Sequence, residues 1–329
     1  MPRFGAYVPS GRKLDLTSYA DGMSKYGALR RVAVQAENLG FDSIWFYDHF
    51  IAMPPGPQSP ETQPVTEATF ECWSLLAALS AVTTRIRLGS MVTSMSYRPP
   101  PLLAKMASVI DVISAGRLNV GIGAGWQESE YRAYGYEYPP LRVRLEQLEE
   151  AILVMKAMWT ETYPVFAGDH FRIDGAINEP KPVQTPHPPL WVGGSGRRTL
   201  RIGAAHGNAV NFSGSPVDIA GACATLASHC ADLGRDYGSI TKSVNFEPVI
   251  IRPTTSEAVA YAATIKPEYY ATVDDWRTRT LIGSPEYCRE RIQEYRAEGI
   301  DYFVSYFADA ADDPAGMNLF AEEVLPAFA

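Results

Sequence analysis

The stretch LRRVAVQAENLGFDSIWFY, residues 29–47, contains two hydrophobic periods in succession. Apolar residues recur at helical spacing from Leu29 to Leu39, and Gly40 suits the position just beyond a helix end. An apolar run, Asp42–Tyr47, follows at once, as expected of a strand buried on both faces of a parallel sheet. A helix feeding a buried strand is the repeating unit of α/β proteins.

The same alternation continues along the chain in both directions. Short apolar runs predict eight strands, at Arg3–Val8, Asp42–Tyr47, Ile86–Val92, Leu118–Ile122, Leu190–Gly193, Ala209–Phe212, Val244–Ile251 and Tyr302–Tyr306. Amphipathic stretches predict further helices at Phe70–Val82, Leu102–Ile113, Leu141–Trp159, Thr199–Ala205, Val217–Leu233 and Pro285–Glu298. Eight parallel strands close a (β/α)8 TIM barrel. We expect one such domain over residues 1–329, although the length alone also fits two ordinary domains.

Three gaps between these elements are longer than a simple barrel needs. The first, Ile51–Thr66, contains five prolines and is expected to be an irregular loop. The second, Tyr163–Pro189, predicts a small hairpin insertion around its two glycines, and the third, Lys266–Ile282, shows no clear pattern. Loops that follow barrel strands carry function, so these insertion segments are candidate walls of a substrate pocket.

Composition excludes several classes of partner. The net charge of −8 argues against nucleic acid, which is usually met by a clustered basic surface. No apolar stretch is long enough to span a membrane and no signal peptide is visible, so we expect a cytoplasmic protein. The histidines lack metal-ligand spacing, so no metal site is expected. The scattered cysteines read as buried free thiols: Cys72, Cys223, Cys230 and Cys288.

The end of the second predicted strand carries an acid and an imidazole side by side, Asp48 and His49. Active sites of TIM barrels lie where the strands end at the carboxyl face. Histidine is well suited to proton transfer near neutral pH. His49 is therefore a candidate catalytic residue with Asp48 beside it; the alternative is a structural histidine bonded within a loop.

Two glycine-rich strand ends are candidate cofactor contacts. Glycines alternate after Leu118 up to Gly125, followed by Trp126, which lets a flat ligand approach the backbone; the spacing is not that of a dinucleotide fingerprint. The second, Gly193–Gly196, precedes a helical run, where backbone N–H groups and the helix dipole favour an anion such as phosphate. A plain tight turn is the alternative reading of the second segment.

Five collinear segments resemble the luciferase-like monooxygenase superfamily over nearly the whole chain. They are GFDSIWFYDHF (40–50), RIRLGSMVT (85–93), DVISAGRLNVGIGAGWQESEYRAYG (111–135), PPLWVGGSGRRTLRIGA (188–204) and LIGSPEYCRERIQEYRAEGIDYF (281–303). The Asp48-His49 pair is similar to the branch that uses the deazaflavin F420.

The resemblance implies a cofactor site and a reaction. Its residues would be Asp48, His49, Ser90, Met91, Ala124, Gly125, Trp126, Gly193, Gly194, Ser195, Gly196, Asn211 and Phe212. Among them, His49 would donate or accept a proton beside the reactive edge of the ring. A non-prolyl cis peptide would support the ring at Ser90–Met91, and Gly193–Gly196 would hold the phosphate. The implied reaction is hydride transfer between F420 and a small organic substrate with a polarised C=C, C=O or C=N bond, in a homodimeric enzyme.

One departure and two alternatives accompany this expectation. Sugar-phosphate dehydrogenases of the F420 branch have a proton-donating Glu directly after the glycine pair, where this chain has Trp126. That departure argues against a sugar-phosphate reaction. One alternative is an FMN-dependent monooxygenase that uses reduced flavin and O2; the other is a flavin-binding barrel without catalysis.

Overall fold

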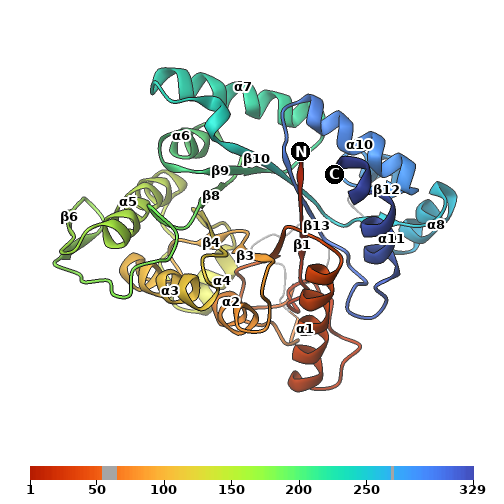
Figure 1. Cartoon of the computed structure of the whole chain (residues 1–329), viewed down its shortest axis with the longest axis horizontal. Coiled ribbons are helices and arrows are strands. Elements are labelled where there is room, and N and C mark those ends of the chain that lie inside the picture. Colours follow the sequence, from red (N-terminus) through yellow and green to blue (C-terminus); the bar gives the residue numbers. More distant parts are fainter. Residues whose placement is uncertain (54–64, 268–269) are drawn as a thin grey trace.

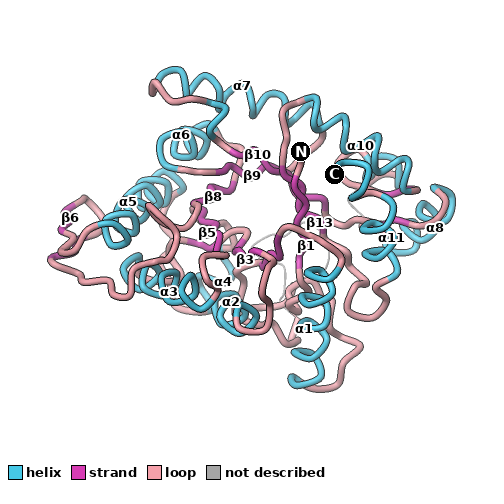
Figure 2. The backbone as a smooth tube through the Cα atoms, viewed as in Figure 1, coloured by secondary structure: helices cyan, strands magenta, loops and turns pink. Residues whose placement is uncertain are grey.

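The computed structural model describes residues 1–53, 65–267 and 270–329. Within these ranges a closed barrel of parallel strands is surrounded by helices (Figures 1 and 2). Its strands, in chain order, are β1 (Arg3–Tyr7), β2 (Ser43–Phe46), β3 (Arg87–Ser90), β4 (Thr93–Ser94), β5 (Leu118–Gly123), β8 (Leu190–Gly193), β9 (Ala209–Phe212), β10 (Thr241–Phe246) and β13 (Tyr302–Ser305). The short β4 continues β3 beyond a break, and pairing of β3 with β5 closes the ring at eight positions. The predicted (β/α)8 TIM barrel is thereby confirmed.

The outer layer consists of helices that follow the barrel strands. The longer ones are α1 (Gly22–Asn38), α2 (Cys72–Ser80), α3 (Pro100–Ile113), α5 (Leu141–Thr160), α6 (Arg197–His206), α7 (Pro216–Asp232), α8 (Thr255–Ile265), α10 (Pro285–Ala297) and α11 (Ala315–Glu323). Two short ones are α4 (Glu128–Ala133) and α9 (Val273–Arg277), and 3-10 turns occupy η1 (Tyr237–Ser239) and η2 (Leu325–Phe328). No helix in the described ranges has the length and apolarity needed to cross a lipid bilayer.

Helix α1 begins seven residues before the predicted Leu29. Asp21 accepts hydrogen bonds from the backbone of Met23 and Ser24, and Ser24 bonds back to Asp21, which forms a capping box. The first turns of α1 are mostly polar or exposed, so the apolar period did not extend over them. The predicted end is confirmed, because Gly40 follows the last turn with a φ of +84°.

The insertion segments differ from simple loops. Residues 163–189 contain the predicted hairpin, β6 (Val165–Ala167) against β7 (Arg172–Asp174). The predicted strand Val244–Ile251 is wrong in its second half, because Pro248 has no N–H to continue the ladder and Ile250–Ile251 forms β11, paired with β12 (Ile282–Gly283). Helices α4, α8, α9 and α11 were not predicted. The five prolines of the first loop lie outside the described residues.

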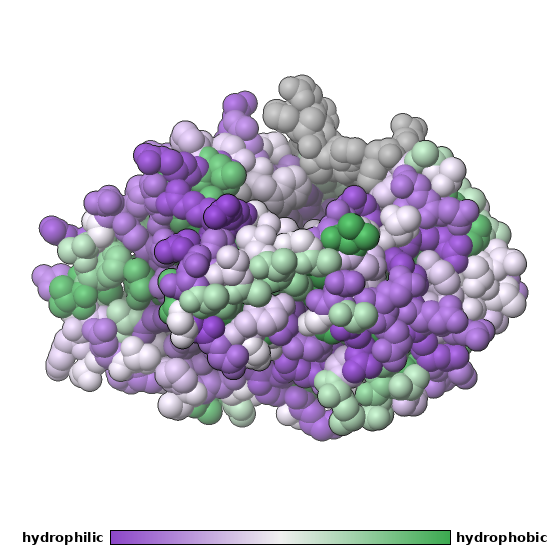
Figure 3. Space-filling view, turned by 90° about the horizontal axis from the view of Figure 1, so that it is seen from above, coloured by the Kyte–Doolittle hydropathy of each residue, from purple (hydrophilic) through white to green (hydrophobic). Residues whose placement is uncertain are grey.

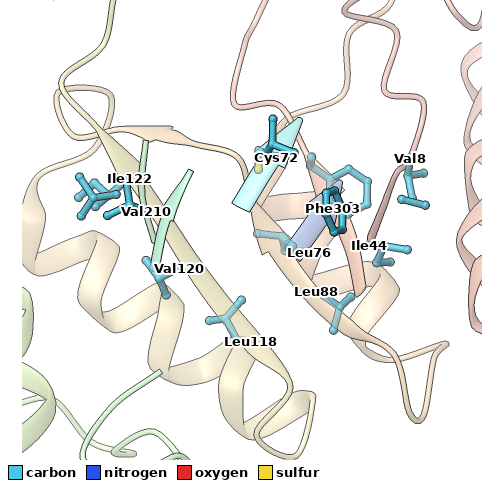
Figure 4. Packing of buried hydrophobic residues seen from close by; sticks show 14 of the residues in the cluster. Val8, Ile44, Cys72, Leu76, Leu88, Leu118, Val120, Ile122, Val210 and Phe303 are labelled. Atoms are coloured by element: carbon cyan, nitrogen blue, oxygen red, sulfur yellow. The ribbon is translucent and has the colours of Figure 1, made fainter. Parts of the chain in front are cut away.

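The hydrophobic core has two parts. The larger one lies between the strands and the surrounding helices, and Figure 4 shows a portion of it with Leu76 of α2 and Ile44 and Leu88 of the strands. All four cysteines are buried free thiols, as predicted. The smaller part fills the barrel interior with Tyr7, Trp45, Met91, Trp191, Ala209, Tyr302, Val304 and Tyr306. Three of these side chains, Tyr7, Met91 and Tyr306, also line a cavity at the strand ends. The face seen in Figure 3 is mostly hydrophilic, with hydrophobic residues in small separate groups.

Candidate active site

A cavity of about 850 Å³ lies at the carboxyl ends of the barrel strands. Most of its lining comes from residues at or beyond the ends of β1, β2, β3, β5, β8, β9, β10 and β13, and the segment from α8 to β12 adds Ile265, Pro267, Tyr270, Trp276 and Arg279. The predicted site residues that line it are Asp48, His49, Met91, Gly125, Trp126, Gly193, Gly194, Asn211 and Phe212. A barrel of parallel strands thus brings together side chains that are far apart in the sequence.

Four predicted site residues lie outside this lining: Ser90, Ala124, Ser195 and Gly196. The hydroxyl of Ser90 bonds to the backbone of Gly121 on the neighbouring strand, with an Oγ to O distance of 2.9 Å. Ala124 packs against the outer core. Ser195 and Gly196 are exposed residues immediately before α6. The structure therefore brings only Gly193 and Gly194 of the predicted phosphate segment to the cavity.

His49 is held by a buried carboxylate. Its Nδ1 lies 2.7 Å from Oε2 of Glu130, whose side chain has no exposed surface. A carboxylate only accepts hydrogen bonds, so Nδ1–H donates to Glu130, and in the tautomer that this contact favours Nε2 is the acceptor. Within the described ranges Nε2 has no hydrogen-bond partner, and His49 lines the cavity. This arrangement can accept a proton at Nε2 and return it.

Glu130 receives enough hydrogen bonds to stay ionised. The Tyr97 hydroxyl donates to Oε2 at 2.7 Å, and the backbone N–H groups of Phe50 and Ile51 donate to Oε1 at 2.9 and 3.2 Å. Burial alone would raise the pKa of Glu130, but the bonds from His49, Tyr97 and Phe50 outweigh it and hold the pKa below its usual range. The same carboxylate thus fixes both the ring and the backbone that follows it.

Asp48 has a different environment from its neighbour. Its two oxygens accept hydrogen bonds from Arg98 Nη1 and Nη2 at 2.7 and 3.0 Å, and Arg98 also contacts Glu71. Burial raises the pKa of Asp48, while Arg98 opposes that shift. A bidentate pair of this kind fixes direction as well as distance. The structure therefore supports an anchoring role for Asp48 beside His49.

The break after β3 shapes the cavity floor. The non-prolyl cis peptide bond in the described ranges is Met91–Val92, so its predicted place at Ser90–Met91 is wrong by one residue. Ser90 still pairs in register with Phe46 of β2, and Met91 N bonds to Phe46 O at 2.8 Å, which keeps the ladder regular up to that point. The side chain of Val92 then lies against Gly193, where an added Cβ would come within 2.8 Å of it.

Glycines follow β8 at the side of the cavity near the break between β3 and β4. At Gly194 the φ is +126°, a conformation that side chains rarely adopt. Helix α6 begins just beyond, and Gly196 at its start has no side chain to cap the first N–H groups. An open helix start beside a glycine pair suits an anionic group. Asn211 and Phe212, at the end of β9, line the same side of the cavity.

Several lining residues were not predicted. They include Tyr7, Arg12, Lys13, Tyr47, Tyr97, Asn245, Glu247, Arg279 and Tyr306. Tyr47 and Tyr306 end predicted strands, so their position was a usable signal. Glu130 lies in the segment 111–135, which resembles the family. Its pairing with His49 spans 81 residues and leaves no local pattern in the sequence. In the described ranges no group of three or more His, Cys, Asp and Glu residues could hold a metal ion.

Comparisons with known proteins identify the family. A family model described as luciferase-like monooxygenase matches residues 2–275. FMNH(2)-dependent dimethylsulfone monooxygenase of Pseudomonas putida is 28% identical over 281 residues, which cover 76% of this chain and 76% of that protein. Pyrimidine monooxygenase RutA of Allorhizobium ampelinum is 31% identical over 223 residues, which cover 67% of this chain and 58% of that protein.

A solved structure agrees on the fold. The F420-dependent secondary alcohol dehydrogenase, determined with an F420-acetone adduct, superposes with a TM-score of 0.81 over 100% of this chain and 99% of its own, at 20% identity. At that identity the likeness concerns the fold alone. Because the family model covers most of the chain, this protein belongs to the luciferase-like monooxygenase family of oxidoreductases.

Proposed function

We propose that the chain is an F420-dependent oxidoreductase that moves a hydride between the deazaflavin and a small organic substrate with a polarised C=C, C=O or C=N bond. The observation that carries the proposal is the His49–Glu130 pair, with Nδ1 2.7 Å from the buried carboxylate. Hydride transfer to or from such a bond needs a proton at the neighbouring atom, and an oriented imidazole meets that need.

The residues around the cavity suit a flavin-like cofactor. Gly193 and Gly194 would hold its phosphate beside the start of α6, where the N-cap residue Gly196 has no side chain to bond the first N–H groups. Trp126, which is 55% exposed, stands edge-on to His49 with ring centroids 5.7 Å apart and would flank the ring. When bound, F420 supplies a hydride donor or acceptor at C5 of its ring.

The chain itself handles the proton. His49 Nε2 would take the proton from a substrate alcohol, or return it to a substrate carbonyl, as the hydride moves. Glu130 would keep Nδ1 protonated and balance the positive charge while the imidazolium exists. The Asp48–Arg98 pair would hold the turn that carries His49. His49 alone would move the proton. Glu130, Asp48 and Arg98 would hold His49 in position.

A second candidate is an FMN-dependent monooxygenase. The dimethylsulfone monooxygenase, which matches 76% of this chain, uses FMNH(2) by its name. Both cofactors have a phosphate and a flat tricyclic ring, so the glycine segment would serve either one.

Titration of the apoprotein with F420 and, separately, with FMN tests the proposal through quenching of each cofactor's fluorescence. Binding of F420 at least about tenfold tighter than FMN supports it, since a tenfold ratio corresponds to ~1.4 kcal/mol of preference. Preference for FMN, together with oxygen consumption coupled to product formation, would replace it with the monooxygenase.

We also propose a homodimer, as the resemblance implies. On α3, Leu102, Val109, Val112 and Ile113 remain exposed although they are apolar. Light scattering coupled to size exclusion measures the mass in solution, and Val109→Glu should convert a dimer to a monomer. A wild-type mass of one chain at micromolar concentration contradicts this proposal.

A further inference from the structure

Three adjacent strands give the cavity a second wall. Ala6 of β1 and Phe246 of β10 both stand opposite Ser305 of β13, so the next residues, Tyr7, Glu247 and Tyr306, lie at one level. All three line the cavity. Tyr47, beyond β2, stacks on Tyr7 with ring centroids 4.4 Å apart and planes 11° from parallel. We call Tyr7, Tyr47, Asn245 and Glu247 the polar wall; its members come from strands other than those of the glycine segment.

The polar wall contains buried groups that lack partners. Within the described ranges, the hydroxyls of Tyr7 and Tyr47 and Oδ1 of Asn245 are buried and complete no hydrogen bond of ordinary geometry, although Glu247 stands near both phenols and Asn245 stands near Tyr7. Tyr7 is only 1% exposed. Buried polar atoms in folded proteins are almost always bonded, because leaving one unpaired is unfavourable. Three such atoms at the edge of one cavity therefore indicate a bound group that both donates and accepts.

The one carboxylate of the polar wall, Glu247, is paired with a lysine. Lys13 Nζ lies 2.6 Å from Glu247 Oε2, and the same ammonium stands 4.9 Å from the ring centre of Tyr47 and 4.6 Å from that of Tyr306. Burial, and after it the Glu247 carboxylate, raise the pKa of Tyr7 and of Tyr47, so both phenols stay neutral and can donate. An anion would compete with Glu247 for Lys13, and a cation would compete with Lys13 for Glu247.

We propose that the polar wall binds an uncharged polar end of the substrate, such as a carboxamide or a hydroxyl, attached to an apolar body. The body would lie in the remaining space, which Met53, Ile265 and Trp276 line. The inference rests on the proposed function only in taking His49 as the reacting end of the same cavity. It narrows the substrate class to neutral molecules with a hydrogen-bonding group away from the reacting bond.

Four probes of nearly equal shape test the inference on the apoprotein. They are benzamide, benzoate, benzamidinium and toluene, which share a phenyl ring and differ in the charge and bonding of one end. Dissociation constants come from NMR titration of the isotope-labelled chain. Benzamide should bind about tenfold more tightly than each of the other three, as expected for one or two hydrogen bonds to neutral groups. Equal binding of all four, tighter binding of an ion, or no binding of benzamide would overturn the inference.

A pair of matched variants locates the bound group. Tyr7→Phe should weaken benzamide about tenfold and leave toluene unchanged. The control, Tyr302→Phe, makes the same change one layer lower in the barrel, where the hydroxyl is already bonded to Ser43 at 2.6 Å and does not line the cavity. It should leave the ratio of the two probes at the wild-type value. An unchanged ratio in Tyr7→Phe would contradict the proposal.

The stability of the two variants gives a readout that needs no ligand. Tyr7→Phe removes an unpartnered hydroxyl and should not lower the midpoint of unfolding, whereas Tyr302→Phe breaks a buried bond and should lower it. A fall in the midpoint for Tyr7→Phe would show that its hydroxyl is already satisfied within the protein. Because these tests use no cofactor, their failure is distinguishable from failure of the F420 titration.

Discussion

The Nδ1 atom of His49 lies 2.7 Å from Oε2 of Glu130, a carboxylate that has no exposed surface. The contact joins the end of β2 to helix α4, the short helix that follows β5. It decides which ring nitrogen holds the proton in the neutral state, and so which one faces the cavity. The proton-transfer role proposed for His49 depends on this contact.

Replacing Glu130 by Gln tests that dependence. The amide can donate to Nδ1, which favours the opposite tautomer, so turnover should fall about 10–100-fold while cofactor affinity stays within a few-fold. Single-turnover oxidation of reduced F420 with a panel of ketones measures the first quantity, and fluorescence titration measures the second. Glu128→Gln is the control, because Glu128 lies in the same helix and pairs only with the exposed Arg132 at 2.6 Å. Equal effects of the two variants would contradict the assignment.

His49→Ala removes the proton-handling group itself. Turnover should fall by about 10²–10⁴, the usual contribution of a general acid or base, and the dissociation constant of the cofactor should change little. His170→Ala provides a comparison, since this histidine lies outside the cavity lining near Glu146, with 3.6 Å between Nε2 and Oε2. If cofactor binding and turnover were lost in the same proportion, His49 would have a structural role.

The lowered pKa of Glu130 predicts a pH dependence of stability. Its folded pKa lies below the unfolded value of about 4.3. The carboxylate therefore stabilises the fold at pH values above the unfolded pKa, and that contribution disappears as the pH falls through the folded pKa. The difference in free energy of unfolding between wild type and Glu130→Gln should shrink as the pH is lowered from about 6 to about 3. Urea denaturation at several pH values measures it, and a constant difference would contradict the shift.

The barrel strands were the most predictable part of the molecule. Leu190–Gly193 and Ala209–Phe212 match the structure residue for residue, because a strand buried on both faces reads as a short and mostly apolar run. The helices that were missed lack such a signal. In α8 only Ala258 and Ala262 are buried, so its apolar stripe is too narrow to be distinguished from a loop.

The site was predictable only up to the strand ends. Asp48 and His49 line the cavity at the strand ends, as expected because parallel strands end at one face of a barrel. Their partners were not predicted, since Arg98 is 50 residues from Asp48 and Glu130 is 81 from His49. Contacts between loops depend on the angles at which chain segments leave the strands. Hydrophobic periodicity does not encode those angles. It therefore cannot distinguish an unpaired carboxylate from one that is held by an arginine, as Asp48 is by Arg98.

The Asp48–Arg98 pair predicts a large effect of removing one partner. Arg98→Met would leave the buried Asp48 carboxylate without its bidentate donor and should lower the free energy of unfolding by about 3–5 kcal/mol. Arg132→Met, which breaks only an exposed pair with Glu128, should change it by less than ~1 kcal/mol. Adding Asp48→Asn to Arg98→Met should recover part of the loss, because the unpaired charge is gone. Strict additivity of the two changes would mean that the pair does not interact in solution.

Gly125 and Gly135 have similar φ angles but different surroundings. Their alanine variants therefore distinguish the cost of backbone strain from the cost of steric collision. Gly125 has a φ of +75° and Gly135 a φ of +72°. An added Cβ at Gly125 would lie 1.9 Å from Tyr131 Oη and 2.6 Å from Ser94 Oγ, two atoms that bond to each other, whereas at Gly135 it would meet nothing within 4 Å. Both alanine variants should lose about 1 kcal/mol through the backbone, within the range for a non-glycine residue in this region.

Gly125→Ala should lose at least ~1–3 kcal/mol more than Gly135→Ala, because it also displaces the buried Ser94–Tyr131 bond. Tyr131 is fully buried and packs beside Tyr97, with ring centroids 5.1 Å apart. It therefore has no free space into which it could move. The displacement would therefore reach Tyr97 and, through its hydroxyl, Glu130. Gly125→Ala should accordingly lower turnover as well as stability, and Gly135→Ala should leave turnover unchanged. Equal stability of the two variants in urea denaturation would show that the Ser94–Tyr131 contact yields without loss.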